Sequence, residues 1–335
     1  MNLNHSIRAV RQPRRLAALC TIAFVLVLGA AFSAGAAEPK NVFHAPVYVT
    51  LQASNAVENM QTGQVFGNLP SAHYDAVSPD GKYLLVSSAN LPKAYLLDAH
   101  SGKPLATFDV GPTPQGVIIG PDSRCGLAVS AGDGTVTVID LKTRKAVRTI
   151  AVGKTPHNAL FTADGKFAYV TLQGQGAVAV LDMRTLTKIA EFPVPGLDHP
   201  HNLDLSANGK ILWIRGLVSK VAAVDLKTHK VLAVIPVGLG HAGIDVIPGG
   251  RYVFTGAIAD HVVDVIDPAT FKVIKRIDVG QGPHGVRASR DGRRVYVGVT
   301  GTHKVAVIDT RTLKVVAQIP THGNLPFWVA VAGNP

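Results

Sequence analysis

The sequence predicts an all-β protein, a seven-bladed β-propeller of four-stranded antiparallel blades, on three observations. A V-x-V-[IL]-D-like run recurs, and the aspartates that end it lie 42, 42, 43, 42 and 42 residues apart: Asp98, Asp140, Asp182, Asp225, Asp267 and Asp309. A fixed period of this length is typical of one propeller blade. The segments between these aspartates are short and rich in β-branched residues, and no stretch after residue 36 shows a sustained helical period.

Each repeat unit divides into four short strands. In the unit from 155 to 196, "HNALFTA", "FAYVTLQ", "AVAVLDM" and "KIAEFPV" are apolar, β-branched or aromatic runs separated by the turn sequences DGK, GQG and RTL. Six complete units begin near these residues: His73, Gln115, His157, His201, Ala242 and His284.

The seventh blade is expected to be assembled from both ends of the chain. "VYVTLQASNAVENMQTGQVFG" (47–67) supplies the outer three strands, and "LPFWVAVAG" (325–333) supplies the inner strand. Pairing of these segments closes the ring and leaves no free radial edge.

The first 36 residues are predicted to be a secretory signal peptide. Four arginines precede the apolar run "LAALCTIAFVLVLGAAF" (16–32), and small residues follow it, so cleavage is expected after Ala36. Residues 37–335 then form a single propeller domain in the periplasm or outside the cell. An uncleaved membrane anchor is the alternative, because the apolar run is long enough to span a bilayer.

Charge and cysteine content exclude some classes of protein. Without residues 1–36, the chain has 29 Lys and Arg against 22 Asp and Glu, a net charge of +7. The basic residues are spread through the repeats rather than clustered with aromatic residues, which excludes a nucleic-acid site. Cys125 is then the one remaining cysteine, so stability must come from a buried core. We expect a monomer without a membrane span, whose partner is a small ligand or a periplasmic protein.

Two repeat units resemble a known family. "FAYVTLQGQGAVAVLDMRTLTKIAEFPV" (167–194) and "VYVGVTGTHKVAVIDTRTLKVVAQIPT" (295–321) resemble the YVTN family of β-propeller repeats, although Leu172 and Val299 replace the Asn of its signature. The resemblance covers all of residues 37–335. That family is similar to the haem-binding propeller domain of haem-type nitrite reductases, the cytochrome d1-like propellers. The resemblance implies the fold more strongly than the function, because propellers host many unrelated activities.

A histidine cluster is predicted at one mouth of the central channel. Each inner strand starts at a Pro-His pair or its equivalent and ends at a D-G-[KR]-like turn, so equivalent residues lie at equal heights around the axis. Six of the 12 histidines after residue 36 fall at or just before these starts. The candidate ligand-binding residues are His73, His157, His201, His284, His241, His199, Phe327 and Trp328.

Imidazole is a common ligand for transition metals and for haem iron, so His157, His201 and His284 are the candidate metal ligands. The candidate cofactors are a transition metal or a haem-like tetrapyrrole. The chain has no C-x-x-C-H motif, which argues against a covalently attached c-type haem. Two other roles remain open for the histidines, namely acid–base chemistry and capping of the inner strands by hydrogen bonds.

The sequence favours a secreted or periplasmic protein that binds a ligand, a metal or a partner at this face without turnover. The alternative is an enzyme at the same face, either a propeller-type lactonase or lyase, or a redox or assembly protein that handles a haem-like tetrapyrrole. The chain has neither G-x-S-x-G nor a P-loop, so any catalytic residues must come together from different blades.

Overall fold

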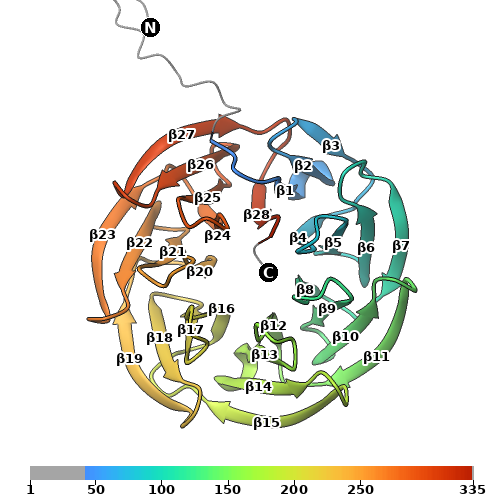
Figure 1. Ribbon diagram of the computed structural model, residues 1–335, viewed down its shortest axis with the longest axis horizontal. Coiled ribbons are helices and arrows are strands. Elements are labelled where there is room, and N and C mark those ends of the chain that lie inside the picture. Colours follow the sequence, from blue (N-terminus) through green and yellow to red (C-terminus); the bar gives the residue numbers. More distant parts are fainter. Residues whose placement is uncertain (1–41, 334–335) are drawn as a thin grey trace, which may run out of the picture. The chain divides into compact units, whose positions relative to one another are not determined.

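Seven four-stranded antiparallel sheets are arranged in a ring around a central channel (Figure 1). The computed structural model describes residues 42–333, and the predicted signal peptide lies outside these residues. The described part contains 28 strands and two 3-10 turns. The predicted all-β, seven-bladed propeller is therefore confirmed. None of the helices within 42–333 is long and apolar enough to cross a membrane.

Blades 1 to 3 follow one another along the chain, each built from its inner strand outward. Blade 1 contains β4 (Ala72–Val77), β5 (Tyr83–Ser88), β6 (Lys93–Asp98) and β7 (Pro104–Asp109). Blade 2 contains β8 (Pro114–Ile119), β9 (Cys125–Ser130), β10 (Thr135–Asp140) and β11 (Lys145–Ala151). Blade 3 contains β12 (Pro156–Phe161), β13 (Phe167–Leu172), the 3-10 turn η3 (Gln173–Gln175), β14 (Ala177–Asp182) and β15 (Thr187–Pro193).

Blades 4 to 6 repeat this arrangement. Blade 4 contains β16 (Pro200–Leu205), β17 (Ile211–Gly216), β18 (Lys220–Asp225) and β19 (Lys230–Pro236). Blade 5 contains β20 (Ile244–Val246), β21 (Val253–Ala257), β22 (Val262–Asp267) and β23 (Lys272–Asp278). Blade 6 contains β24 (Pro283–Ala288), β25 (Arg294–Val299), β26 (Lys304–Asp309) and β27 (Lys314–Pro320).

Blade 7 joins the two ends of the described chain, as the sequence predicts. Its inner strand is β28 (Pro326–Val331), and its outer strands are β1 (Val47–Leu51), β2 (Ala56–Asn59) and β3 (Gln64–Phe66), with the 3-10 turn η2 (Gln52–Ser54) after β1. β28 and β1 are antiparallel, with Val331 opposite Val47, and they lie side by side in Figure 1. This pairing closes the ring without a free radial edge.

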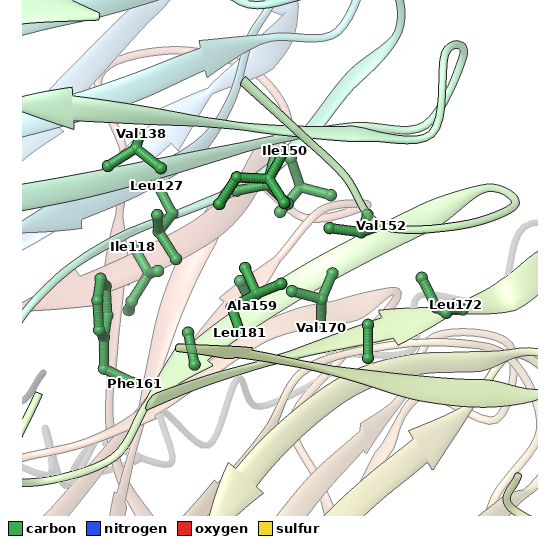
Figure 2. Packing of buried hydrophobic residues seen from close by; sticks show 14 of the residues in the cluster. Ile118, Leu127, Val138, Ile150, Val152, Ala159, Phe161, Val170, Leu172 and Leu181 are labelled. Carbon is green, nitrogen blue, oxygen red and sulfur yellow. The ribbon is translucent and has the colours of Figure 1, made fainter. Parts of the chain in front are cut away.

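The hydrophobic core lies between neighbouring blades. Figure 2 shows the cluster between blades 2 and 3, where Leu127 and Val138 face Ala159 and Val170. Alternate residues of each strand point to opposite faces of the blade, so every blade buries apolar side chains against both neighbours. The inner strands are consequently held at one height and in one orientation by packing from both sides.

Replacing Gly165 with valine is expected to destabilise the protein by about 1 to 3 kcal/mol while leaving binding at the histidine face unchanged. Gly165 has φ +67° in the turn after β12, at the opposite end of that strand from His157. A Cβ would lie 3.3 Å from Cγ of Pro121, and a β-branched residue is strained at this φ. Chemical denaturation measures the loss, and Gly67→Val, with an ordinary φ and open space around an added Cβ, is the control. Lost ligand binding in folded Gly165→Val protein would show that the functional face is misassigned.

Candidate functional site

Each blade contributes one side chain to one mouth of the central channel. In blades 3 and 6 the register of the inner strand shifts between the proline and the third residue after it, which marks a β-bulge at the Pro-His pair. Such a bulge re-aims the side chains beside it. We call the residues that gather there the mouth ring: His73, Gln115, His157, His201, His241, His284 and Phe327.

Contacts between side chains run from blade to blade around the mouth ring. The ring centroids of His157 and His201 lie 3.7 Å apart, as do those of His284 and Phe327. His241 stands edge-on between the two pairs, with its centroid 4.8 Å from His201 and 5.1 Å from His284. Residues more than 40 positions apart in the sequence are therefore direct neighbours here.

His73 completes the mouth ring, and Tyr74 and Trp328 pack next to it. The imidazole of His73 stacks on Phe327 at 4.5 Å, and its Nε2 lies 3.2 Å from Oε1 of Gln115. Tyr74 is buried and packs on Trp328 with centroids 4.2 Å apart. Trp328 was predicted as a ligand-binding residue, and the structure places it in the core cluster between blades with Tyr74.

Hydrogen bonds orient the imidazoles. Nδ1 of His284 donates to the carbonyl oxygen of Phe327 at 3.1 Å, and Nδ1 of His157 donates to that of His201 at 3.2 Å. A carbonyl oxygen only accepts, so in both residues Nδ1 carries the proton and Nε2 keeps its lone pair. Nδ1 of His201 accepts a hydrogen bond from Nε2 of Gln173 at 2.6 Å. That amide offers a donor and an acceptor, so it satisfies either tautomer of His201 after a rotation.

Three imidazoles lie close enough together to be a candidate metal site. His201, His241 and His284 each offer a nitrogen atom, and these nitrogens lie within 4.8 Å of one another. Nε2 of His201 and Nε2 of His284 are buried without a hydrogen-bond partner among residues 42–333. Buried polar atoms are nearly always bonded, so this pair marks a place suited to a ligand. Imidazole nitrogens around one tetrahedral ion lie about 3.3 Å apart, so the cluster would close by at most about 1.5 Å.

Burial keeps these imidazoles neutral. It lowers the pKa of His157 to about 3 and that of His73 to about 4, the latter partly offset by the hydrogen bond to Gln115. The pKa values of His201 and His284 lie well below the usual value, first because of burial and then because neighbouring imidazoles would repel a second charge. Neutral imidazole is the form that binds metals.

His199 lies outside the mouth ring. It is exposed on the loop before β16, with φ 51°, and its Nδ1 donates to the carbonyl oxygen of Gln173 at 3.1 Å. Three residues that support the site were not predicted: Tyr74, Gln173 and Arg215. Tyr74 and Arg215 are recognisable in the sequence as departures from the repeat, because most other blades have glycine, asparagine, serine or threonine at those places.

Below the mouth ring, charged residues connect blades 4, 5 and 6. Asp204 accepts a hydrogen bond from the backbone N–H of Val246 at 2.6 Å, and Asp245 accepts one from the backbone N–H of Ala288. Nη1 of Arg287 lies 3.6 Å from Oδ1 of Asp245. Each carboxyl group therefore connects its own blade to the next by a hydrogen bond. We interpret these residues as stabilising the packing of the blades.

Asp75 differs from the other carboxyl groups of the channel. It is 2% exposed, and neither of its oxygens accepts a hydrogen bond from another residue in the described chain. It borders a small internal cavity together with Arg287. Burial raises the pKa of Asp75 well above the usual value, although the charge of Arg287 acts in the other direction. A carboxyl group with a raised pKa therefore lies next to the mouth ring on β4.

Comparison with known proteins supports the resemblance seen in the sequence. A family model for the cytochrome D1 haem domain matches residues 212–326. The chain is similar to a haem-binding propeller. The match covers blades 5 and 6 and parts of blades 4 and 7, including His241, His284 and Arg215. No curated protein matches the chain.

Solved structures confirm the fold. Hydrazine synthase from Kuenenia stuttgartiensis superposes with a TM-score of 0.71 at 22% sequence identity, covering 79% of this chain and 91% of that chain. A functionally unknown protein from Desulfotomaculum acetoxidans DSM 771 superposes with a TM-score of 0.73 at 13% identity, covering 87% of this chain and 100% of that chain. At these identities the similarity concerns the propeller fold alone.

The mouth ring fits a single metal ion better than it fits a tetrapyrrole between its side chains. Stacking distances of 3.7 Å between His157 and His201, and between His284 and Phe327, leave no room for a macrocycle within the ring. A tetrapyrrole would have to lie across the mouth, where the half-buried His241 is the most accessible imidazole of the cluster. A metal ion needs only the nitrogens that already converge.

Proposed function

We propose that this propeller is a binding protein that holds one first-row transition-metal ion at its mouth ring through His201, His241 and His284. The observation that supports this most directly is the cluster of three imidazoles, each of which offers a nitrogen within 4.8 Å of the other two. In addition, Nε2 of His201 and Nε2 of His284 are buried without a hydrogen-bond partner in the described chain. Three imidazoles with an open fourth position suit zinc or copper, and copper(II) is bound more tightly by a given set of nitrogen ligands. His241 therefore replaces His157 in the ligand set predicted from the sequence.

The residues around the cluster support this role. The Nδ1–H of His284 donates to a backbone carbonyl, which is the usual outer-shell partner of a metal-bound histidine because it fixes the ring and directs Nε2 to the ion. The Gln173 amide would give the same support to His201 after a rotation that places its Oε1 opposite Nδ1. A bound ion would supply a Lewis-acidic centre with one open coordination position.

A haem-like tetrapyrrole is the second candidate ligand, and the family-model match over residues 212–326 favours it. It would lie across the mouth ring with His241 as the residue placed to reach its iron. The signal-like pattern of residues 1–36 supports action in the periplasm or outside the cell. That the protein is a monomer, and that it works with a small ligand or a protein partner, stay predictions.

Metal binding is tested with metal-free protein titrated separately with Cu²⁺, Zn²⁺ and haem. We expect about one equivalent of Cu²⁺ or Zn²⁺ to bind. Loss of one outer-shell partner of a metal ligand reduces metal affinity about 10- to 100-fold. The His201→Ala, His241→Ala, His284→Ala triple variant removes the ligands themselves, so a larger loss of affinity is expected. Affinity is measured by competition with a chelator, and melting temperature shows whether each variant is folded.

A triple variant of exposed histidines, His44→Ala, His100→Ala and His229→Ala, is the matched control, because it removes the same number of imidazoles from the surface away from the mouth ring. It is expected to bind like the wild type. Equal loss in both triple variants would indicate non-specific binding by histidines. If the visible spectrum shows that haem binds, and neither Cu²⁺ nor Zn²⁺ binds, the ligand is a tetrapyrrole and not a metal ion.

A further inference from the structure

His241 reaches the mouth ring from a different repeat position than the other histidines. In blades 3, 4 and 6 the imidazole directly follows a proline, whereas blade 5 has Ala242 at that place and His241 where the proline stands. The inner strand of blade 5, β20, begins only at Ile244. Hydrogen bonds to Ala242 and Gly243 hold the chain directly after His241. The chain before His241 belongs to no strand, so another part of the structure must hold it.

The loop before His241 is held by hydrogen bonds from three directions. The N–H of Gly238 donates to Oδ2 of Asp264 at 2.5 Å, and the N–H of Leu239 donates to Oδ2 of Asp260 at 2.9 Å. The N–H of Gly240 donates to the carbonyl oxygen of Val218 at 2.7 Å. The three N–H groups of the loop are thus all satisfied, and the carbonyl oxygen of Leu239 accepts from the N–H of Ala259 at 3.1 Å. The carbonyl groups of Gly238 and Gly240 are left to be bonded from the other side.

Arg215 on β17 binds those carbonyl groups. Its side chain is fully buried, and its Nη2 donates to the carbonyl oxygen of Gly238 at 2.8 Å and to that of Gly240. Its Nη1 donates to the carbonyl oxygen of Lys220 at 3.1 Å, which anchors the guanidinium on its own blade. The planar, pre-organised donors of arginine suit several fixed acceptors at once.

No other blade has a charged residue at the place of Arg215. The equivalent residues are Thr50, Ser87, Val129, Thr171, Gly256 and Gly298. Thr171 and its hydroxyl counterparts bond the inner strand of the next blade, as Thr171 does with the carbonyl oxygen of His201 at 2.8 Å. Burying a guanidinium instead costs several kcal/mol unless its bonds compensate. Blade 4 therefore departs from the repeat at a residue whose side chain contacts the loop before His241.

The loop also has little freedom to adopt another shape. A Cβ on Gly238 would lie 2.6 Å from Cβ of Ala257, and a Cβ on Gly240 would lie 2.6 Å from Cγ2 of Ile258. The backbone therefore packs directly against blade 5, with Arg215 on its other side. Removal of the guanidinium would leave the carbonyl groups of Gly238 and Gly240 without these bonds, and the loop would be free to move away.

We propose that Arg215 is a positioning residue for the metal site, which holds the Gly238–Gly240 loop so that His241 lies between His201 and His284. This inference rests on the proposed metal-binding function. Arg215 is not one of the three ligands, and its hydrogen bonds act on the site through the loop and His241.

The test is a double-mutant cycle on the full chain, with Cu²⁺ as the probe. Arg215→Thr introduces the residue found at the same place in blades 3 and 7, and it is expected to reduce Cu²⁺ affinity about 10- to 100-fold. In a His241→Ala background the same substitution is expected to have no further effect on affinity, because the ligand through which it acts is absent. Arg215→Lys, which keeps one donor group, is expected to recover part of the loss.

Spectroscopy separates a positioning role from a purely structural one. Electron paramagnetic resonance of the Cu²⁺-loaded protein is expected to show three nitrogen ligands in the wild type and two in Arg215→Thr. The control is Arg294→Thr, a substitution of another largely buried arginine, which pairs with Asp309 on blade 6. It is expected to lower the melting temperature without changing the number of nitrogen ligands or the affinity.

Asp260→Ala keeps the test decisive if Arg215→Thr does not fold. It releases the N–H of Leu239 from the same loop without touching a buried charge, so a smaller loss of affinity in the same direction is expected. Wild-type affinity with three nitrogen ligands in Arg215→Thr, or an equal loss with and without His241, would overturn the inference while leaving metal binding intact. A wild-type protein that binds neither Cu²⁺ nor Zn²⁺ would overturn the proposed function and this inference together.

Discussion

Deletion of Leu325–Pro335 is expected to abolish soluble, folded protein. This segment contains β28, the inner strand of blade 7, which pairs with β1 and buries Trp328, Val329 and Val331. Burial of each large apolar side chain stabilises by about 1.5 to 3 kcal/mol, and the total stability of a domain is only about 5 to 15 kcal/mol. The deletion also exposes the unpaired edge of β1, which favours aggregation.

Expression in the soluble fraction and circular dichroism measure this effect. A circularly permuted chain is the control: it begins at Asn68, before blade 1, and joins residue 333 to residue 42 by a short linker. It keeps β28 beside β1, where the N–H of Ala332 already donates to the carbonyl oxygen of Pro46 at 2.9 Å, and is expected to fold. A truncated chain that stays soluble with an unchanged melting temperature would refute closure of the ring by β28.

Asp75→Asn is expected to stabilise the protein at neutral pH. Neither oxygen of Asp75 accepts a hydrogen bond from another residue in 42–333, so the neutral amide loses no such bond, and Arg287 keeps Asp245 as its partner. Because the folded-state pKa of Asp75 is raised, its contribution to stability is fully present below pH 3.8 and is lost as the pH rises toward the folded-state value. The gain from Asp75→Asn should therefore grow as the pH rises above 3.8, with a slope of at most about 1.4 kcal/mol per pH unit, until the pH passes the folded-state pKa of Asp75.

Urea denaturation of both proteins at several pH values between 4 and 8 measures this gain. Asp164→Asn is the control with the opposite sign, because hydrogen bonds from Thr162 and the N–H of Lys166 lower the pKa of Asp164 to about 2. That carboxylate stabilises the fold above pH 3.8 and loses its contribution as the pH falls toward 2. A pH-independent difference between Asp75→Asn and the wild type would show that Asp75 is ionised in the folded protein.

Repetition made much of the candidate site predictable. His73, His157, His201 and His284 occupy one repeat position, and because the blades share one pairing pattern, this position lies at one height around the channel. Phe327 follows the same rule on β28 and stacks on His284. Histidines outside this repeat position could not be placed by the same argument. His199 is near the same position in sequence but lies on an exposed loop.

The order of the strands, their number and the closure of blade 7 were determined by the sequence itself, since a 42-residue period and alternating apolar residues permit one way of burying both faces of every blade. The tertiary structure alone decided which imidazole nitrogens converge. His241 enters the cluster because Arg215 and Asp264 hold a loop that departs from the repeat, and Nε2 of His284 faces inward because Nδ1 bonds the next blade. These choices depend on hydrogen bonds between residues more than 20 positions apart, and local sequence patterns do not encode such bonds.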